Sequence, residues 1–192
     1  MKAAITNILL VGVGGQGILL ASEILSETFM LAGYDVKKSE IHGMSQRGGS
    51  VVSHVRYGSE VFSPIVPEGE GDILFGFELL ETCRYLSLLK KGATVIANDL
   101  CIPPPSVLSG KDIYPEGLTE KIGLLFPDFL LVDGLKLANE AGNARAANTA
   151  LLGAVSRRLD IPEEFWMKAM AKMVPPKAIE VNRKAFLAGR KL

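Results

Sequence analysis

The pattern of apolar and polar positions divides the chain into short apolar runs and longer segments of helical period. Runs of strand length predict strands at residues 5–13, 35–39, 50–57, 72–76, 93–98 and 129–133. Apolar residues recurring every three or four positions predict helices at residues 15–32, 78–89, 115–126, 135–140, 144–159, 162–173 and 178–187. Alternating strands and helices indicate a three-layer α/β/α fold with a mostly parallel sheet. We expect a Rossmann-like β-α-β start with a right-handed crossover.

One part of the pattern predicts antiparallel pairing. Residues 50–57 alternate apolar and polar side chains, and Gly58-Ser59 separates them from a second short run at residues 60–63. A two-residue turn between such runs is typical of a hairpin, so we expect a mixed sheet. Residues 101–106 include three consecutive prolines and are expected to lack regular structure, whereas Ile113 is expected in a short strand.

The composition fits a single domain that covers residues 1–192 and excludes two classes of partner. Lys plus Arg and Asp plus Glu both total 21, so the chain has no overall charge to attract nucleic acid or an anionic membrane surface. No apolar stretch reaches the ~18 residues that a membrane span requires. The N-terminal segment fits a buried first strand better than a signal peptide. These observations predict a cytoplasmic protein.

The first candidate site is the glycine turn between the first strand and the first helix. It reads Gly12-Val13-Gly14-Gly15-Gln16-Gly17. Glycines let the backbone approach a ligand, and a helix N-terminus offers unpaired N–H groups that favour a phosphate or carboxylate. The candidate binding residues are Gly12, Gly14, Gly15, Gln16 and Gly17. Alternatively, the glycines only permit tight strand-to-helix packing and bind no ligand.

The second candidate site is the turn that follows the strand at residues 35–39. It reads Ser39-Glu40-Ile41-His42-Gly43-Met44-Ser45-Gln46-Arg47-Gly48-Gly49. Arg47 offers a fork of donors to phosphate or carboxylate, and Gly48 and Gly49 let backbone N–H groups converge on the same oxygen atoms. The candidate binding residues are Glu40, Gln46, Arg47, Gly48 and Gly49. Alternatively, Glu40 and Arg47 form an internal ion pair.

Two residues of this turn suggest further chemistry. Glu40 lies about 20 residues past the first glycine turn, where dinucleotide-binding folds place an acid that holds a ribose hydroxyl. A stand-alone NAD- or FAD-binding oxidoreductase is therefore the alternative function. His42 is the candidate catalytic residue because its ordinary pKa of about 6.5 suits proton transfer. A hydrogen-bonded structural role is the other interpretation of His42, and the preferred one for His54.

The sequence lacks a complete catalytic or metal-binding set. It has no Walker lysine, no Gly-x-Ser-x-Gly elbow, no His-Glu-x-x-His pair and no thiamine diphosphate motif. Cys83 and Cys101 stand apart in sequence and are expected to be reduced thiols, so no metal site is expected. An adenylating enzyme, which has a similar glycine turn, would require a cysteine in a recognisable context, and neither cysteine has one.

The two glycine turns together resemble a known family. Gly12 to Gly17 and Ser39 to Arg56 are similar to the gamma-type subunit or domain of the 2-oxoacid:ferredoxin oxidoreductases. The wording His-Gly-Met-Ser-Gln-Arg-Gly-Gly favours the indolepyruvate branch over the pyruvate and 2-oxoglutarate branches. Residues 148–154 and 176–189 also resemble this family, so the similarity spans nearly the whole chain.

The resemblance implies a share in the oxidative decarboxylation of an aryl pyruvate to an acyl-coenzyme A, with ferredoxin as electron acceptor. It also implies that thiamine diphosphate and [4Fe–4S] clusters belong to a larger alpha subunit, that ferredoxin meets the complex rather than this chain, and that coenzyme A is a co-substrate. The isolated chain is then expected to be inactive and to bind no cofactor by itself.

We therefore hypothesise that the two glycine turns lie together at the carboxyl edge of the sheet. They would face the alpha subunit near the path of coenzyme A, and Arg47 would meet a phosphate or an acidic residue of the partner. In isolation the chain is expected to expose an apolar partner-facing surface, through which it can form a homodimer.

Overall fold

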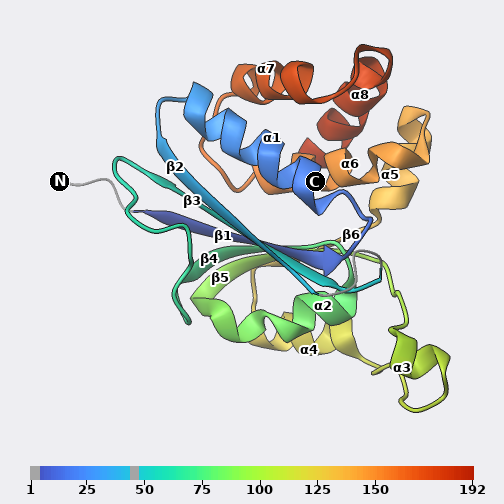
Figure 1. Cartoon of the computed structure of the whole chain (residues 1–192). Coiled ribbons are helices and arrows are strands. Elements are labelled where there is room, and N and C mark those ends of the chain that lie inside the picture. The colour runs from blue at the N-terminus through green and yellow to red at the C-terminus, as the bar shows by residue number, and fades with distance from the viewer. Residues whose placement is uncertain (1–4, 44–47) are drawn as a thin grey trace.

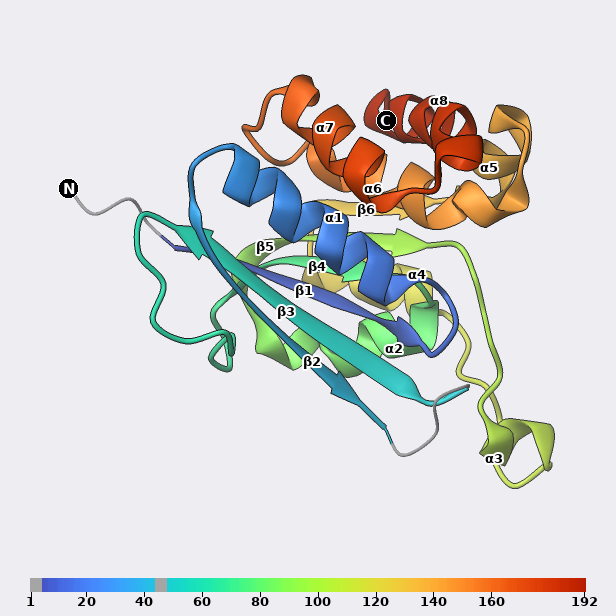
Figure 2. The same ribbon diagram turned by 45° about the horizontal axis from the view of Figure 1, so that its top comes forward.

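A computed structural model describes residues 5–43 and 48–192. Its six-stranded sheet has the order β2-β3-β1-β4-β5-β6 (Figures 1 and 2). The strands are β1 (Thr6–Val13), β2 (Asp35–His42), β3 (Ser50–Gly58), β4 (Gly71–Gly76), β5 (Leu89–Asn98) and β6 (Phe129–Val132). β1, β4, β5 and β6 run parallel, and β3 is antiparallel to both β1 and β2. The mixed, mostly parallel sheet is therefore confirmed.

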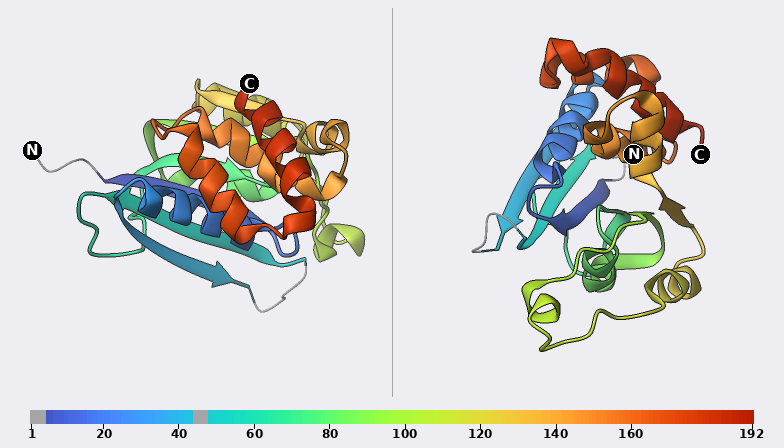
Figure 3. Two further views of the ribbon diagram at one scale, coloured as in Figure 1. Left: turned by 90° about the horizontal axis from the view of Figure 1, so that it is seen from above. Right: turned by 90° about the vertical axis from the view of Figure 1, so that its right-hand side faces the viewer.

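Helices cover both faces of this sheet. The helices are α1 (Ile18–Leu31), α2 (Leu79–Arg84), α3 (Pro105–Leu108), α4 (Leu118–Leu125), α5 (Gly134–Ala141), α6 (Ala147–Ser156), α7 (Glu163–Met173) and α8 (Ile179–Arg190), with 3₁₀ turns at Leu86–Leu88, Ala144–Ala146 and Pro176–Ala178. Figures 1 and 3 show α1 and α5 to α8 on one side of the sheet and α2 and α4 on the other. The three-layer prediction holds, and none of the described helices is long and apolar enough to cross a membrane.

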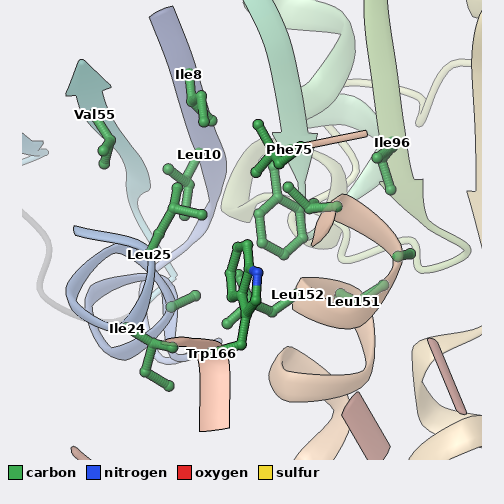
Figure 4. Packing of buried hydrophobic residues seen from close by; sticks show 14 of the residues in the cluster. Ile8, Leu10, Ile24, Leu25, Val55, Phe75, Ile96, Leu151, Leu152 and Trp166 are labelled. Carbon is green, nitrogen blue, oxygen red and sulfur yellow. The ribbon is translucent and has the colours of Figure 1, made fainter. Parts of the chain in front are cut away.

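The continuous apolar runs are explained by burial on both faces of the sheet. Side chains of a strand alternate between faces, so Ile8 and Leu10 join the core under α1 while Leu9 and Val11 join the core over α2 and α4. All four are fully buried. Trp166 of α7 closes the larger core (Figure 4), where its ring packs edge-on against Phe29 of α1.

The predicted hairpin is placed wrongly. Its turn at Gly58-Ser59 leads into residues 60–63, which form no strand, and β3 instead pairs with β2 through the second glycine turn. The segment after β3 is held by a side chain: the N–H of Val61 donates to Asp35 Oδ2 at 2.8 Å. β3 thereby separates β1 from β2, so the two strands of the β-α-β start are parallel but not neighbours.

Three smaller predictions also need correction. The helix expected at residues 78–89 ends at Arg84, and Leu89 already begins β5. The proline-rich connector contains a single turn of helix, α3, since a proline is tolerated in a first helical turn. Ile113 lies outside any strand and is 89% exposed.

α6 and α8 approach closely because glycines face each other. A Cβ added to Gly189 would lie 1.8 Å from the Ala150 carbonyl oxygen, and one added to Gly153 would lie 2.1 Å from that of Phe186. Both obstacles are backbone atoms, which cannot rotate away. The distance between these helices is thus fixed by the absence of two side chains.

We predict that Gly189→Ala destabilises the protein by about 2 kcal/mol or more, because the new methyl group must push two helices apart. Gly123→Ala is the matched control: it is also helical, but its Cβ would meet only Phe129 at 3.7 Å. Alanine is favoured over glycine in a helix by about 1 kcal/mol, so the control should be neutral or stabilising. Urea denaturation measures both, and equal effects would contradict the packing argument.

Candidate functional site

The first glycine turn begins where β1 ends and closes at the N-terminus of α1. Gly17 precedes the helix in the left-handed conformation, with φ of +81°. A Cβ at this position would lie 2.6 Å from Asn148 Nδ2, near the start of α6. Glycine is therefore favoured at residue 17 by its left-handed backbone, and the missing side chain leaves room for the Asn148 carboxamide.

Gln16 has a structural role in this turn. Its Oε1 accepts from the Val13 N–H at 2.7 Å, and its Nε2 donates to the Phe77 carbonyl at 2.8 Å. The Phe77 N–H donates to the Val11 carbonyl. In a continued parallel β1–β4 ladder, the next hydrogen bond would run from the Val13 N–H to the Phe77 carbonyl oxygen. The Gln16 carboxamide bridges these two groups where β1 and β4 separate. Gln16 is thus occupied within the protein, and the proposed ligand contact would have to displace these bonds.

The structure brings the two glycine turns together. The Gly14 N–H donates to the Gly49 carbonyl at 2.9 Å, and the Gly48 N–H approaches the Gly14 carbonyl at 3.5 Å. These contacts continue the antiparallel pairing of β1 with β3, which ends at Val13 and Ser50. The turns therefore lie side by side at the carboxyl edge of the parallel strands (Figure 2).

Two glycines leave the backbone uncovered at this edge. Gly15 and Gly48 have φ of +104° and +78°, and a Cβ on either would meet no atom of the described residues within 4 Å. Gly12 is different, because a Cβ at this position would lie 2.8 Å from the Cβ of Phe77. Gly15 and Gly48 are open toward a ligand or a partner, while Gly12 and Gly17 serve internal packing.

Glu40 and His42 lie near the end of β2. Glu40 Oε1 accepts from the Ser22 hydroxyl of α1 at 2.9 Å and lies 3.5 Å from Lys38 Nζ, while Oε2 lies 3.8 Å from His42 Nε2. Glu40 thus ties β2 to α1. Gln46 and Arg47 fall outside the described residues, and so does the predicted Glu40–Arg47 ion pair. The side chain of His42 is 53% exposed.

Sequence reasoning missed two carboxylates beneath the turns. Ser50, which follows Gly49, donates to Glu81 Oε2 at 2.5 Å and lies 3.2 Å from the Tyr85 hydroxyl. Glu78 precedes α2, and its Oε2 accepts from the Glu81 N–H at 2.8 Å. Both carboxylates are almost fully buried. The acid three residues before another acid, at the start of a helix, was the available signal for the cap.

His54 is a structural histidine. It is 4% exposed, and its Nδ1 accepts from the Val66 N–H at 3.2 Å. Burial, with a smaller effect of the nearby Arg56 charge, lowers the pKa of His54 because both disfavour the protonated ring. The neutral ring accepts one bond that holds the chain after β3.

The described residues hold no group of three or more side chains suited to a metal ion. Cys83 is half-buried, Cys101 is exposed, and burial raises the pKa of the Cys83 thiol. What remains at the carboxyl edge is a pair of glycine turns that offer backbone N–H and C=O groups. Fold and site together define an α/β protein whose candidate site is this edge of the sheet.

Comparison with known sequences places the chain in a family. It belongs to the pyruvate ferredoxin/flavodoxin oxidoreductase family, whose model matches residues 7–192. The chain is 44% identical to indolepyruvate oxidoreductase subunit IorB of Thermococcus kodakarensis, over 96% of this chain and 94% of the relative. It is 40% identical to the IorB subunit of Archaeoglobus fulgidus, over 95% and 92%. The family expectation from the glycine turns is confirmed.

Solved structures share the fold. The gamma subunit of a keto/oxoacid ferredoxin oxidoreductase from Geobacter sulfurreducens superposes with a TM-score of 0.69 at 26% identity, covering 97% of this chain and 96% of that one. A 2-oxoglutarate:ferredoxin oxidoreductase from Magnetococcus marinus gives 0.71 at 18% identity, where this chain spans only 31% of the longer chain. The same fold therefore exists both as a separate subunit and as one part of a larger polypeptide.

We predict that Gln16→Ala lowers the free energy of unfolding by about 1–3 kcal/mol, because it leaves the Val13 N–H and the Phe77 carbonyl without this partner. Gln16→Glu is the graded control, since it keeps the acceptor for Val13 and loses the donor to Phe77. It should cost less than the alanine variant. Denaturation of the isolated chain measures the loss, and wild-type stability for Gln16→Ala would restore the ligand-binding interpretation.

Proposed function

We propose that this chain is the small subunit of an indolepyruvate:ferredoxin oxidoreductase and supplies a binding surface to a larger, catalytic subunit. The reaction is the oxidative decarboxylation of an aryl pyruvate to an aryl-acetyl-coenzyme A, with electrons passed to ferredoxin. Support comes from nearly full-length similarity to the IorB subunits of T. kodakarensis and Pyrococcus horikoshii, at 44% and 43% identity.

The contact between the two glycine turns is the observation that carries this proposal. The Gly14–Gly49 hydrogen bond of 2.9 Å joins two loops whose open glycines, Gly15 and Gly48, present backbone rather than reactive side chains. Such a surface binds and positions, but it supplies neither a nucleophile nor an electron carrier. The reactive groups, thiamine diphosphate and [4Fe–4S] clusters, are assigned to the larger alpha subunit.

Coenzyme A is the proposed ligand near the turns. Ligands of open α/β sheets bind outside the carboxyl ends of the strands, and backbone N–H groups of glycine turns suit phosphate oxygens. We place Gly14, Gly15, Gly48 and Gly49 along the path of coenzyme A to the partner's active site. Arg47 is assigned to a phosphate of coenzyme A or to an acidic residue of the partner.

The alternative, a stand-alone NAD- or FAD-binding enzyme, has less support from the strand order. In the dinucleotide fold the acid that holds the ribose ends the strand next to the glycine turn. Here β3 occupies that place, and Glu40 lies one strand farther away on β2. Glu40 is also engaged by Ser22 and Lys38.

Reconstitution tests the proposed function. The purified chain alone should show no indolepyruvate-dependent reduction of ferredoxin, and addition of the proposed larger subunit should restore coenzyme A-dependent turnover. Cofactor analysis should find thiamine, iron and sulfide with the larger subunit only. Turnover of an oxoacid by this chain alone, or a retained NAD or flavin, would refute the proposal.

For Arg47 we predict that Arg47→Ala raises the Michaelis constant for coenzyme A or the dissociation constant of the two subunits by tenfold or more. The reason is the loss of a charge-assisted hydrogen bond, worth about 1.5–3 kcal/mol. Arg158→Ala is the matched control, since Arg158 pairs with Asp128 just before β6, at the opposite edge of the sheet. If neither constant changes for Arg47→Ala, the role given to Arg47 is wrong.

A further inference from the structure

A long connection leaves the fold at the same edge as the glycine turns. We define residues 101–114, between β5 and α4, as the arm; it includes α3 and projects away from the sheet (Figures 1 and 2). Two of its large apolar side chains are turned to solvent: Leu108 is 75% exposed and Ile113 is 89% exposed. Neither contributes to the cores of this domain.

The arm is anchored at both ends by one buried carboxylate. Oε1 of Glu78, which is 1% exposed, accepts from the Ile102 N–H at 3.0 Å and from the Tyr114 hydroxyl at 2.5 Å. Burial and this hydrogen bond raise the pKa of Tyr114, so its hydroxyl stays a donor. The same carboxylate caps α2 through Oε2. Glu78 therefore closes the base of the arm and ties it to the helix beneath the second glycine turn.

The chain within the arm is also restricted. Pro103, Pro104 and Pro105 fix three successive φ angles, and α3 begins at the last of them. The N–H groups of Lys111 and Asp112 both donate to the Ser106 carbonyl, which folds the tip back. An apolar tip on a restricted support loses little conformational entropy on binding, and this is the property of a preorganised contact.

We propose that the arm is a docking element that places Leu108 and Ile113 in an apolar recess of the larger subunit. This inference rests on the proposed function. The occupant follows from position: the arm starts after β5 ends, at the carboxyl edge, and whatever subunit faces the open glycines there is also within reach of the arm. The Magnetococcus marinus chain, of which this fold spans 31%, shows that the fold is compatible with a much larger attached body.

Binding between the purified subunits tests the arm. The variant Leu108→Asp/Ile113→Asp should raise the dissociation constant at least 100-fold, since two carboxylates would have to enter an apolar recess. The matched control is Leu124→Asp/Leu125→Asp: these leucines are 84% and 66% exposed in the last turn of α4, at the opposite edge. The control should bind within threefold of wild type. All four positions are exposed, so unchanged melting temperatures confirm that both variants fold.

A second variant separates the tip from its support. Tyr114→Phe keeps both apolar side chains and removes the hydroxyl that donates to Glu78. It should weaken assembly by five- to tenfold, because the arm loses one of its two anchors. At saturating subunit, the ferredoxin-reducing activity of every variant complex should return to the wild-type kcat, since the proposal gives the arm a docking role only.

The outcomes are distinguishable. If wild type and control bind the larger subunit and the arm variant binds equally well, the docking role is wrong while the proposed function stands. If wild type itself does not bind, both proposals fail. If light scattering shows that the arm variant abolishes self-association and leaves binding to the larger subunit unchanged, the arm docks on a second copy of this chain and the proposal is overturned.

Discussion

The antiparallel pairing of β3 with β1 is the constraint on which the site depends. It inserts β3 between the two strands of the β-α-β start and carries the second glycine turn to the first, where the Gly14 N–H meets the Gly49 carbonyl. Gly14 and Gly49, which are 35 residues apart in sequence, thereby become parts of one surface. If β2 paired directly with β1 instead, Glu40 would end the strand beside the first glycine turn, as the ribose-binding acid does in a dinucleotide fold.

Much of the fold could be predicted because burial on both faces leaves a simple pattern. Runs such as residues 8–11 read as strands regardless of their neighbours. The pairing of β3 could not be predicted, since its alternating pattern fits either adjacent segment. After β3 the chain is held at the start of β2, where the Asp35 carboxylate accepts from the Val61 N–H. A side chain 26 residues distant leaves no local signal.

The sequence predicts that the two glycine turns form the candidate site, but it does not separate the structural residues of these turns from the open ones. The sequence identifies the glycines as turn residues. It does not show which glycines contact other residues of the protein and which are open to solvent. Gly17 is fixed by Asn148, a residue of α6 that no local pattern connects with it, whereas Gly15 is open. From the sequence, Gln16 is interpreted as a ligand-binding amide. Its partners, Val13 and Phe77, are available only because the β1–β4 ladder ends beside it, and this is visible only in the structure. The buried acids Glu78 and Glu81 show their role only once Ser50 and the arm are placed.

The buried or engaged polar groups of the described site residues have structural roles. Glu40, Glu78, Glu81 and His54 each hold a neighbouring segment in place, and a carboxylate or imidazole already engaged by internal donors is a poor base or nucleophile. Their bonds instead fix the positions of β2, the second glycine turn and the arm. A surface held in this way would lose little conformational entropy on binding, because the backbone groups that it presents are already ordered before a partner arrives. A fixed shape at this edge is what the proposed role beside a catalytic subunit requires.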